Sequence, residues 1–199
     1  STANSGLYDA LLPQFTAATG IRVHVVAVGT GQAIRNARTG DGDLLLVHAQ
    51  EAEEQFVADG YGVERRDVMY NDFIIVGPAG DPAGVGDADS ADAALVVIKD
   101  RGIFYSRGDD SGTNKKELAL WEAAGVAPEG DWYKESGQGM GDTLRIASEK
   151  QGYTLTDRAT YLNLKPNLDL EVAYEGSDDL FNQYGVIVIT DATSMEGAE

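Results

Sequence analysis

Short apolar runs alternate with helix-like patterns along most of the chain. Leu7, Leu11 and Phe15 lie four residues apart, which predicts an amphipathic helix over 6–19. Apolar and polar residues then alternate, and the run stays apolar to its end, which predicts a strand over 21–28. Because helices and strands follow one another in turn, the pattern predicts an α/β protein with a parallel sheet.

The same alternation continues to the end of the chain. The run 44–47 is a compact apolar strand between Asp43 and His48, and the helix after it is stopped by Gly60. Further strands are expected at 44–47, 73–76, 103–105, 153–155, 170–174 and 185–190, and further helices from 31 onward and at 49–58, 91–99, 113–124, 141–150 and 157–164.

Composition limits the function classes that fit. With 199 residues, 43% of them hydrophobic, the chain can bury a core as one domain or as two small lobes. No apolar run is long enough to span a bilayer. The absence of cysteine excludes disulfides, a thiol nucleophile and a zinc–thiolate site. A net charge of −18 argues against a nucleic-acid partner, because such a surface repels phosphate backbones.

The segment 106–113, Ser-Arg-Gly-Asp-Asp-Ser-Gly-Thr, carries the clearest chemistry. It joins the predicted strand 103–105 to the predicted helix that follows. A tight turn into a helix start aims unpaired backbone N–H groups at one point, with the positive end of the helix dipole behind them. Arg107 adds a forked cation, and Ser111 and Thr113 add hydroxyl donors. The segment is therefore predicted to bind an oxyanion without a metal, although both hydroxyls could instead cap their own helix.

Other polar residues are weaker candidates. Thr30 lies in a Gly-Thr-Gly turn between a predicted strand and a predicted helix, where glycine permits a close approach to a ligand or simply a tight turn. His48 ends a predicted strand and is expected to be a hydrogen-bonded structural residue. Asp109, Asp110 and Asp157 are accompanied by neither metal-ligand spacing nor a Ser/His pair, so an enzyme acting on phosphate or sulfate esters is disfavoured.

Several separated blocks resemble one known family, the tungstate-binding proteins of ABC importers. The longest block is Arg-Gly-Asp-Asp-Ser-Gly-Thr followed, after one residue, by Lys-Lys-Glu-Leu-Ala-Leu-Trp. The similar blocks occur in the same order over nearly the whole chain, which makes a chance match improbable. They are 29–33 (GTGQA), 44–54 (LLLVHAQEAEE), 66–78 (RDVMYNDFIIVGP, beginning at the arginine), 107–121, 135–143 (ESGQGMGDT) and 153–158 (YTLTDR).

The resemblance implies a type II periplasmic-binding-protein fold, in which two α/β lobes are joined by two crossing segments and hold the ligand in a cleft between them. On this basis we expect one lobe to comprise 1–76 with 178–199, and the other to comprise 79–175. The resembled proteins also have a strand before a Thr/Ser-rich loop and a further helix at the end. The present segment is expected to begin inside that loop and to lack that helix.

The resemblance assigns anion contact specifically to Arg107 and Thr113. Ser1 and Thr2 match the end of the Thr/Ser loop, and the expected ligand set is completed by Ser111 and Thr30. No cofactor, metal or catalytic residue is implied. The expected partners are the oxyanion and an ABC permease, and the protein is expected to be a periplasmic or extracytoplasmic monomer; no signal peptide is present in this segment.

The choice of anion depends on the two aspartates of the turn. Tungstate, molybdate and sulfate are fully deprotonated near neutral pH and suit a site made only of donors, whereas phosphate carries a proton and needs an acceptor. If Asp109 or Asp110 faces the ligand, phosphate becomes plausible; if both point outward or pair with basic side chains, the larger dianions are favoured. Tungstate is the primary expectation, and molybdate shares its size and charge. The alternatives are a phosphate- or sulfate-binding protein of the same fold and an oxyanion-sensing domain of a regulator.

Overall fold

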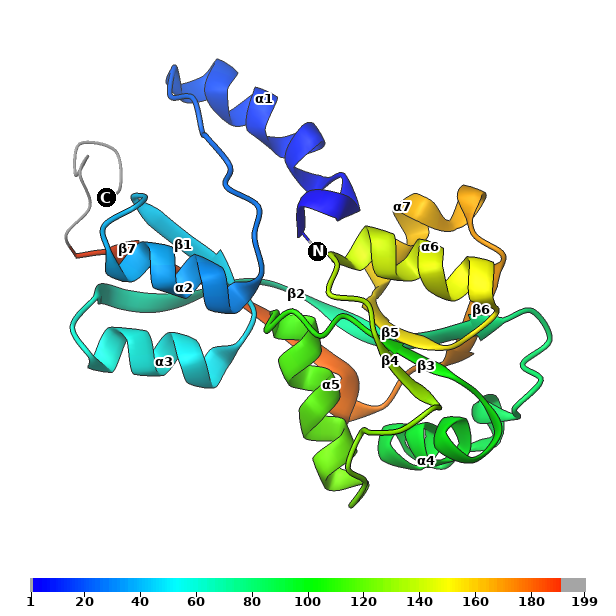
Figure 1. Cartoon of the computed structure of the whole chain (residues 1–199). Helices are drawn as coiled ribbons and strands as arrows, with labels where there is room; N and C mark the ends of the chain where they lie inside the picture. The colour runs from blue at the N-terminus through cyan, green and yellow to red at the C-terminus, as the bar shows by residue number, and fades with distance from the viewer. Residues whose placement is uncertain (1, 191–199) are drawn as a thin grey trace. The chain divides into compact units, whose positions relative to one another are not determined.

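The computed structural model describes residues 2–190, which form two compact units (Figure 1). Each unit is assembled from segments that are far apart in the sequence. None of the helices in this described part is long and apolar enough to cross a membrane. The lobe bounds inferred from the resemblance stay a prediction. The first unit contains 2–6, Asn71–Asp109 and Thr113–Phe181, and the second contains Leu7–Tyr70, Asp110–Gly112 and 182–190.

The first unit is built on the second half of the long strand β2. This part of β2 pairs antiparallel with β5 on one side and with β6 on the other, while β3 pairs parallel with β4. Helices α4 to α7 pack around these strands. The elements are β2 (Gly62–Pro78), α4 (Ala91–Arg101), β3 (Phe104–Ser106), α5 (Gly112–Ala123), β4 (Tyr133–Glu135), α6 (Met140–Lys150), β5 (Thr154–Asp157), α7 (Arg158–Leu164) and β6 (Leu170–Tyr174), with η1 (Thr2–Ser5) against α7.

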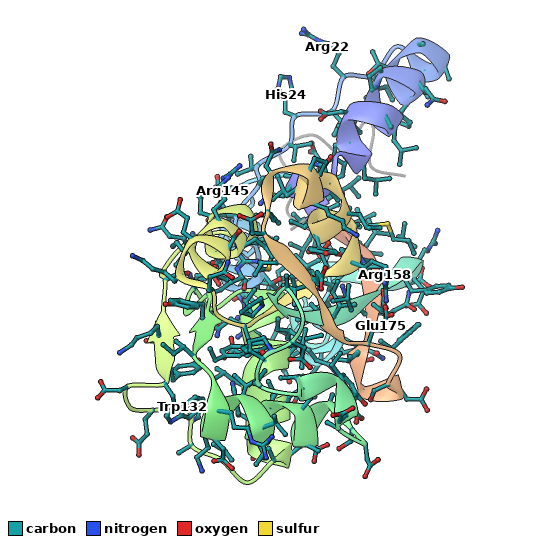
Figure 2. The ribbon with its side chains drawn as sticks, turned by 90° about the vertical axis from the view of Figure 1, so that its right-hand side faces the viewer. Arg22, His24, Trp132, Arg145, Arg158 and Glu175 are labelled. Atoms are coloured by element: carbon teal, nitrogen blue, oxygen red, sulfur yellow. The ribbon has the colours of Figure 1, made fainter. Side chains whose placement is uncertain are left out.

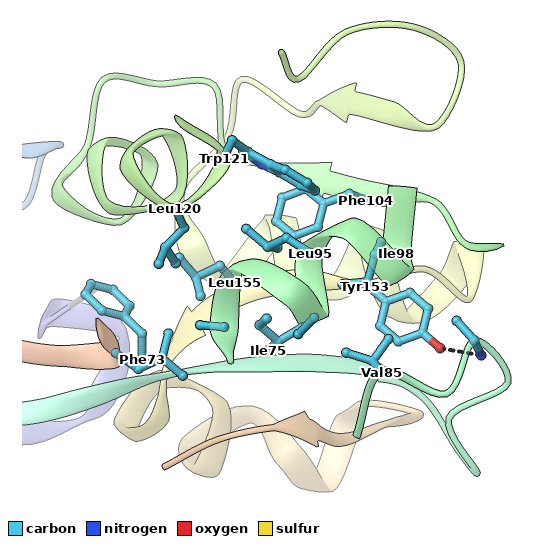
Figure 3. Packing of buried hydrophobic residues seen from close by; sticks show 14 of the residues in the cluster. Phe73, Ile75, Val85, Leu95, Ile98, Phe104, Leu120, Trp121, Tyr153 and Leu155 are labelled. Atoms are coloured by element: carbon cyan, nitrogen blue, oxygen red, sulfur yellow. Dashed lines mark hydrogen bonds between the residues drawn. The ribbon is translucent and has the colours of Figure 1, made fainter. Parts of the chain in front are cut away.

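Both faces of β2 are covered in this unit. Ile74 and Ile75 are successive residues of the strand and therefore point to opposite faces, and both are fully buried. Ile75 belongs to a cluster with Trp121 and Tyr153 (Figure 3), whereas Ile74 packs with Met140 and other residues of α6 and α7. A strand buried on both faces is a rigid support for the loops at its ends.

The second unit has its own small sheet and core. β1 pairs antiparallel with β7, with Leu45 opposite Ile187, and β7 lies next to β2 in the strand order. Phe56 of α3 is fully buried against this sheet. The elements are α1 (Leu7–Thr19), α2 (Thr30–Arg38), β1 (Leu44–Val47), α3 (Gln50–Ala58), the first half of β2 and β7 (Phe181–Ile189).

The strand predicted at 21–28 is wrong. Residues 21–29 have no regular secondary structure, and Val26 is 73% exposed. Figure 2 shows Arg22 and His24 projecting from this segment. An alternating pattern forms a strand only where a neighbouring strand completes its hydrogen bonds, and the described residues provide no such neighbour for this segment. Helix α1 is where it was predicted, but it buries none of its residues.

The prediction of a parallel sheet is also wrong. Among residues 2–190, β1 pairs antiparallel with β7, and β2 pairs antiparallel with β5 and with β6. β3 pairs parallel with β4, and an isolated parallel bridge joins Phe104 of β3 to Tyr153. Alternation of helices and strands favours parallel crossovers only when consecutive strands share a sheet. Here β2 pairs with strands that come much later in the chain, and the local pattern contains no information about such distant partners.

Candidate functional site

The turn between β3 and α5 carries the predicted oxyanion residues. β3 ends at Ser106 and α5 begins at Gly112. Gly108 has a φ of +60°, and a Cβ at this position would lie 2.8 Å from Cβ of Glu135, so the turn requires glycine. The backbone carbonyl of Arg107 accepts a hydrogen bond from the N–H of Gly137 at 2.9 Å, which braces the turn from the neighbouring loop.

Arg107 is a buried cation whose hydrogen-bond donors are only partly used. The residue is 5% exposed, and its Nη2 donates to the Asp109 carboxylate at 2.6 Å. Its Nε–H is buried and has no hydrogen-bond partner among the described residues. A buried donor without a partner costs about 1–3 kcal/mol, so this side chain has unused capacity for a charged acceptor.

Thr113 presents a second unpartnered group at the other end of the turn. Its side chain is 1% exposed, and Oγ1 is buried without a hydrogen-bond partner in the described part of the chain. A hydroxyl that capped its own helix would accept a backbone N–H. Thr113 does not do so, which leaves its hydroxyl for another acceptor. Arg107 and Thr113 thus lie in the same unit, at the two ends of one turn, and each has a buried donor without a hydrogen-bond partner among the described residues.

Two further predicted residues, Thr30 and Ser111, belong to the second unit and are buried. Oγ1 of Thr30 accepts a hydrogen bond from the N–H of Gly112 at 3.1 Å, so this hydroxyl helps to fix the end of the turn. At Gly31 a Cβ would lie 1.9 Å from a carboxylate oxygen of Asp110, so this glycine allows the close approach of the turn to α2. The spacing of Gly-Thr-Gly had left open whether glycine served a turn or a close approach.

The first residues of the chain give less information. Thr2 is half-buried in η1, and its carbonyl accepts a hydrogen bond from the Ser5 hydroxyl at 2.7 Å. Ser1 lies outside the described residues. The contact of these two residues with an anion stays a prediction.

Both aspartates of the turn pair with arginine. Asp109 binds Arg107, and Asp110 lies 3.4 Å from Nη1 of Arg35 in α2, where both side chains are at least half exposed. Asp110 also adopts a φ of +56°, and its carbonyl accepts from the N–H of Gly31. The sequence had left two alternatives for these carboxylates, and pairing with basic side chains is the one that the structure contains.

His48 is a structural residue, as expected. Its Nδ1 lies 3.0 Å from Oδ1 of Asn182, and its ring stacks on Tyr184 with the centroids 4.8 Å apart. A Cβ at Gly112 would lie 2.8 Å from the His48 ring. Within residues 2–190 there is no group of three or more histidine, cysteine or acidic residues that could hold a metal ion.

Sequence reasoning missed the buried carboxylate of Glu117, which lies beneath the turn. It accepts hydrogen bonds from Ser106, Tyr133, Trp121 and Asn114. Burial raises the pKa of Glu117, and the four hydrogen bonds act in the opposite direction without cancelling the rise. The signal was present in the sequence, because 117, 120 and 121 share one helix face and the other two residues are apolar.

The chain is similar to known proteins over most of its length. The whole chain, residues 1–199, matches the family model of the PBP superfamily domain. It is 55% identical over 192 residues to the tungstate-binding protein TupA of Peptoclostridium acidaminophilum, a match that covers 95% of this chain and 67% of that protein.

Two solved structures are also similar. A crystal structure described as the tungstate ABC transporter from Geobacter sulfurreducens matches with a TM-score of 0.86 and 51% identity, covering 95% of this chain and 81% of that one. The tungstate-binding protein TupA of Desulfovibrio alaskensis G20 matches with a TM-score of 0.77 and 47% identity, covering 94% and 78%.

The chain spans from 58% to 71% of the length of the three curated relatives that it matches. The α/β architecture is that of periplasmic-binding proteins. The chain therefore belongs to the PBP superfamily and, within it, to the family of the tungstate-binding proteins TupA.

Proposed function

We propose that the protein binds tungstate as the solute-binding component of an ABC importer. The observation that carries this proposal is the pair of buried, unpartnered donors on one turn, Nε of Arg107 and Oγ1 of Thr113. Both atoms can donate to an oxyanion, and an anion that accepted from both would remove the cost of leaving them unpaired. The names of the two TupA relatives and of the Geobacter structure support the same ligand.

The charge pattern of the turn favours an anion without a proton. Asp109 and Asp110 each pair with an arginine, which is the arrangement in which we expect the larger dianions to be favoured. Tungstate and molybdate then fit better than phosphate. Ser111, Thr30, Thr2 and Ser1 complete the proposed set of contacts, through hydroxyl or backbone donors. Binding requires no cofactor, metal or catalytic step.

The site of action follows from the role. We infer that the protein works outside the cytoplasmic membrane as a monomer and passes its anion to an ABC permease. Closure around the ligand is the signal that such a permease would recognise. A ligand that binds a closed form more tightly than an open form shifts the population toward the closed form.

Thermal unfolding with a panel of anions tests the function. The chain is heated without ligand and with tungstate, molybdate, sulfate or phosphate, each in large excess over protein. A ligand at about 1,000 times its dissociation constant adds about 4 kcal/mol to stability, which raises the midpoint by several degrees. Tungstate is expected to do so, and phosphate is not. A shift with phosphate alone would replace the proposal with a phosphate-binding protein, and no shift with any anion would refute it.

A further inference from the structure

The turn that carries Arg107 is tied to a buried hydrogen-bond network centred on Glu117. The Glu117 side chain is 2% exposed, and each of its two carboxylate oxygens has its own partners. Oε1 accepts from Nε1 of Trp121 at 3.1 Å and from the hydroxyl of Tyr133 at 2.8 Å. Oε2 accepts from the hydroxyl of Ser106 at 2.6 Å and, at the longer distance of 3.5 Å, from Nδ2 of Asn114.

Ser106 links this network to the turn. Its Oγ accepts from the backbone N–H of Gly108 at 3.2 Å and from Nδ2 of Asn114 at 3.3 Å. A serine hydroxyl has one hydrogen and two lone pairs. With both lone pairs occupied by N–H donors, the single hydrogen must go to Glu117. The orientation of the hydroxyl is therefore fixed by the carboxylate, and the position of Gly108 is fixed by the hydroxyl.

We propose that Glu117 is a positioning residue for anion binding, which acts through Ser106 to hold the turn that carries Arg107. The inference rests on the proposed function, because it assigns a role within that site. Gly108 directly follows Arg107 and adopts a left-handed φ, so the backbone there is held by specific contacts and not by intrinsic preference. Losing the Gly108–Ser106 hydrogen bond frees the segment that aims the Arg107 side chain.

The two oxygens of Glu117 provide a matched pair of variants. Ser106→Ala removes a hydrogen bond at Oε2 and breaks the link to Gly108. Tyr133→Phe removes a hydrogen bond at Oε1 of the same carboxylate, together with the interaction of its hydroxyl with Ser106. It leaves the Ser106–Glu117 and Gly108–Ser106 hydrogen bonds in place. If Glu117 only stabilises the core, the two variants should affect binding equally, whereas positioning predicts that only the first weakens it.

Glu117→Gln tests the carboxylate itself. Trp121 Nε1 can only donate, so the glutamine must place its amide oxygen toward Trp121, at the position of Oε1. Its amide nitrogen then takes the position of Oε2 and faces Ser106. The Ser106 hydroxyl has only two lone pairs but then faces three donors, which are the Gly108 N–H, Nδ2 of Asn114 and the new amide nitrogen. The hydrogen of the Ser106 hydroxyl also loses the carboxylate that accepted it. We therefore expect this variant to resemble Ser106→Ala. The double variant with Ser106→Ala and Glu117→Gln should bind tungstate no more weakly than Ser106→Ala alone. Both substitutions break the same chain of hydrogen bonds from Glu117 through Ser106 to Gly108.

The experiment is calorimetric titration of tungstate into the wild-type chain and the variants, with unfolding midpoints measured without ligand. We expect Ser106→Ala and Glu117→Gln each to weaken binding about tenfold, equivalent to about 1.4 kcal/mol, and Tyr133→Phe to stay within about twofold. The amide resonance of Gly108 in ¹H–¹⁵N spectra should shift in the first two variants and not in the third.

The outcomes separate this inference from the function on which it rests. If the wild-type chain binds no tungstate, the proposed function itself fails, and this inference falls with it. If the wild-type chain binds and Ser106→Ala retains affinity within about twofold, only the positioning role is overturned. Equal weakening by Tyr133→Phe would overturn it too. If Ser106→Ala does not fold, the tungstate affinity of Glu117→Gln is compared with that of Tyr133→Phe, and the same difference is expected.

Discussion

Arg107 and Thr113 are buried at the two ends of one turn, and each keeps a donor that the described chain does not use. Folding normally pairs such groups, because an unpaired buried donor lowers stability by about 1–3 kcal/mol. Two such deficits on one seven-residue segment (107–113) are unusual for a purely structural turn. They are expected for a site that completes its hydrogen bonds with a ligand.

Replacing Arg107 by alanine removes the cation that the anion would face. We expect Arg107→Ala to weaken tungstate binding about 100-fold or more, since a hydrogen bond to a charged group contributes about 1.5–3 kcal/mol and the anion also loses its counter-charge. Calorimetry measures the loss. Arg145→Ala is the control, because Arg145 is an exposed arginine of α6 that pairs with Asp142 (Figure 2). Similar affinity in both variants would exclude Arg107 from the site.

Thr113→Val separates binding from stability. The substitution keeps the shape of the side chain and removes only the unpartnered hydroxyl. We expect tungstate binding to weaken about tenfold, whereas the free energy of unfolding without ligand should stay the same or rise, because a buried unsatisfied group is lost. Chemical denaturation and calorimetry give the two values. A loss of stability without ligand would mean that the hydroxyl has a partner within the protein, contrary to our account.

At the scale of elements, the hydrophobic pattern located most helices and strands but not their pairing. The runs at 44–47 and 170–174 appear as β1 and β6 at the predicted positions. β2 was predicted only over 73–76, because residues 64–67, Glu-Arg-Arg-Asp, are charged and do not resemble a strand. The error at 21–28 has the opposite cause, since its pattern is that of a strand but no strand among the described residues pairs with it. Local pattern encodes element type, whereas pairing depends on distant segments.

The same distinction applies to the site. Arg107 and Thr113 could be predicted because a strand, a glycine turn and a helix start are consecutive in the sequence. The role of Ser106 and Tyr133 could not, because β4 supplies Tyr133 from another part of the chain and Glu117 is the point where they meet. Contacts of this kind depend on tertiary packing.

The network around Glu117 predicts a pH dependence of stability. Its pKa is raised from 4.5 in the folded protein, chiefly by burial. The folded state therefore holds this proton more tightly than the unfolded state, and its contribution to stability is lost as pH rises through the raised pKa. We expect the unfolding free energy of wild type minus that of Glu117→Gln to fall as pH increases above 4.5. Denaturation at several pH values measures it, and a flat or rising difference would contradict the raised pKa.

At the scale of the whole molecule, two compact units with separate cores carry a strong excess of acidic residues. The family could be identified from separated sequence blocks in a fixed order, whereas neither the composition nor the local pattern distinguished one domain from two lobes. The net charge of −18 is compatible with an anion ligand, because donors within the protein act at contact distance and surface charges are screened beyond about 8–10 Å.

The charge also predicts how salt affects the ligand-free chain. Mutual repulsion of the acidic groups opposes the compact state, and salt screens it. We expect the unfolding midpoint to rise by several degrees as sodium chloride increases from about 0.01 to 0.5 M, with sulfate avoided because it could bind. Sucrose at matched osmolality serves as a control for general solvent effects. A midpoint that falls with sodium chloride would mean that favourable ion pairs outweigh the repulsion.

The central claim is that Arg107 and Thr113 hold the anion. The most direct test is a crystal structure of the chain grown with tungstate, in which anomalous scattering locates the tungsten atom. Our account predicts one tungsten peak, with oxygens within about 2.7–3.2 Å of Nε of Arg107 and Oγ1 of Thr113. Tungsten bound elsewhere, with these two atoms still unpartnered, would contradict it.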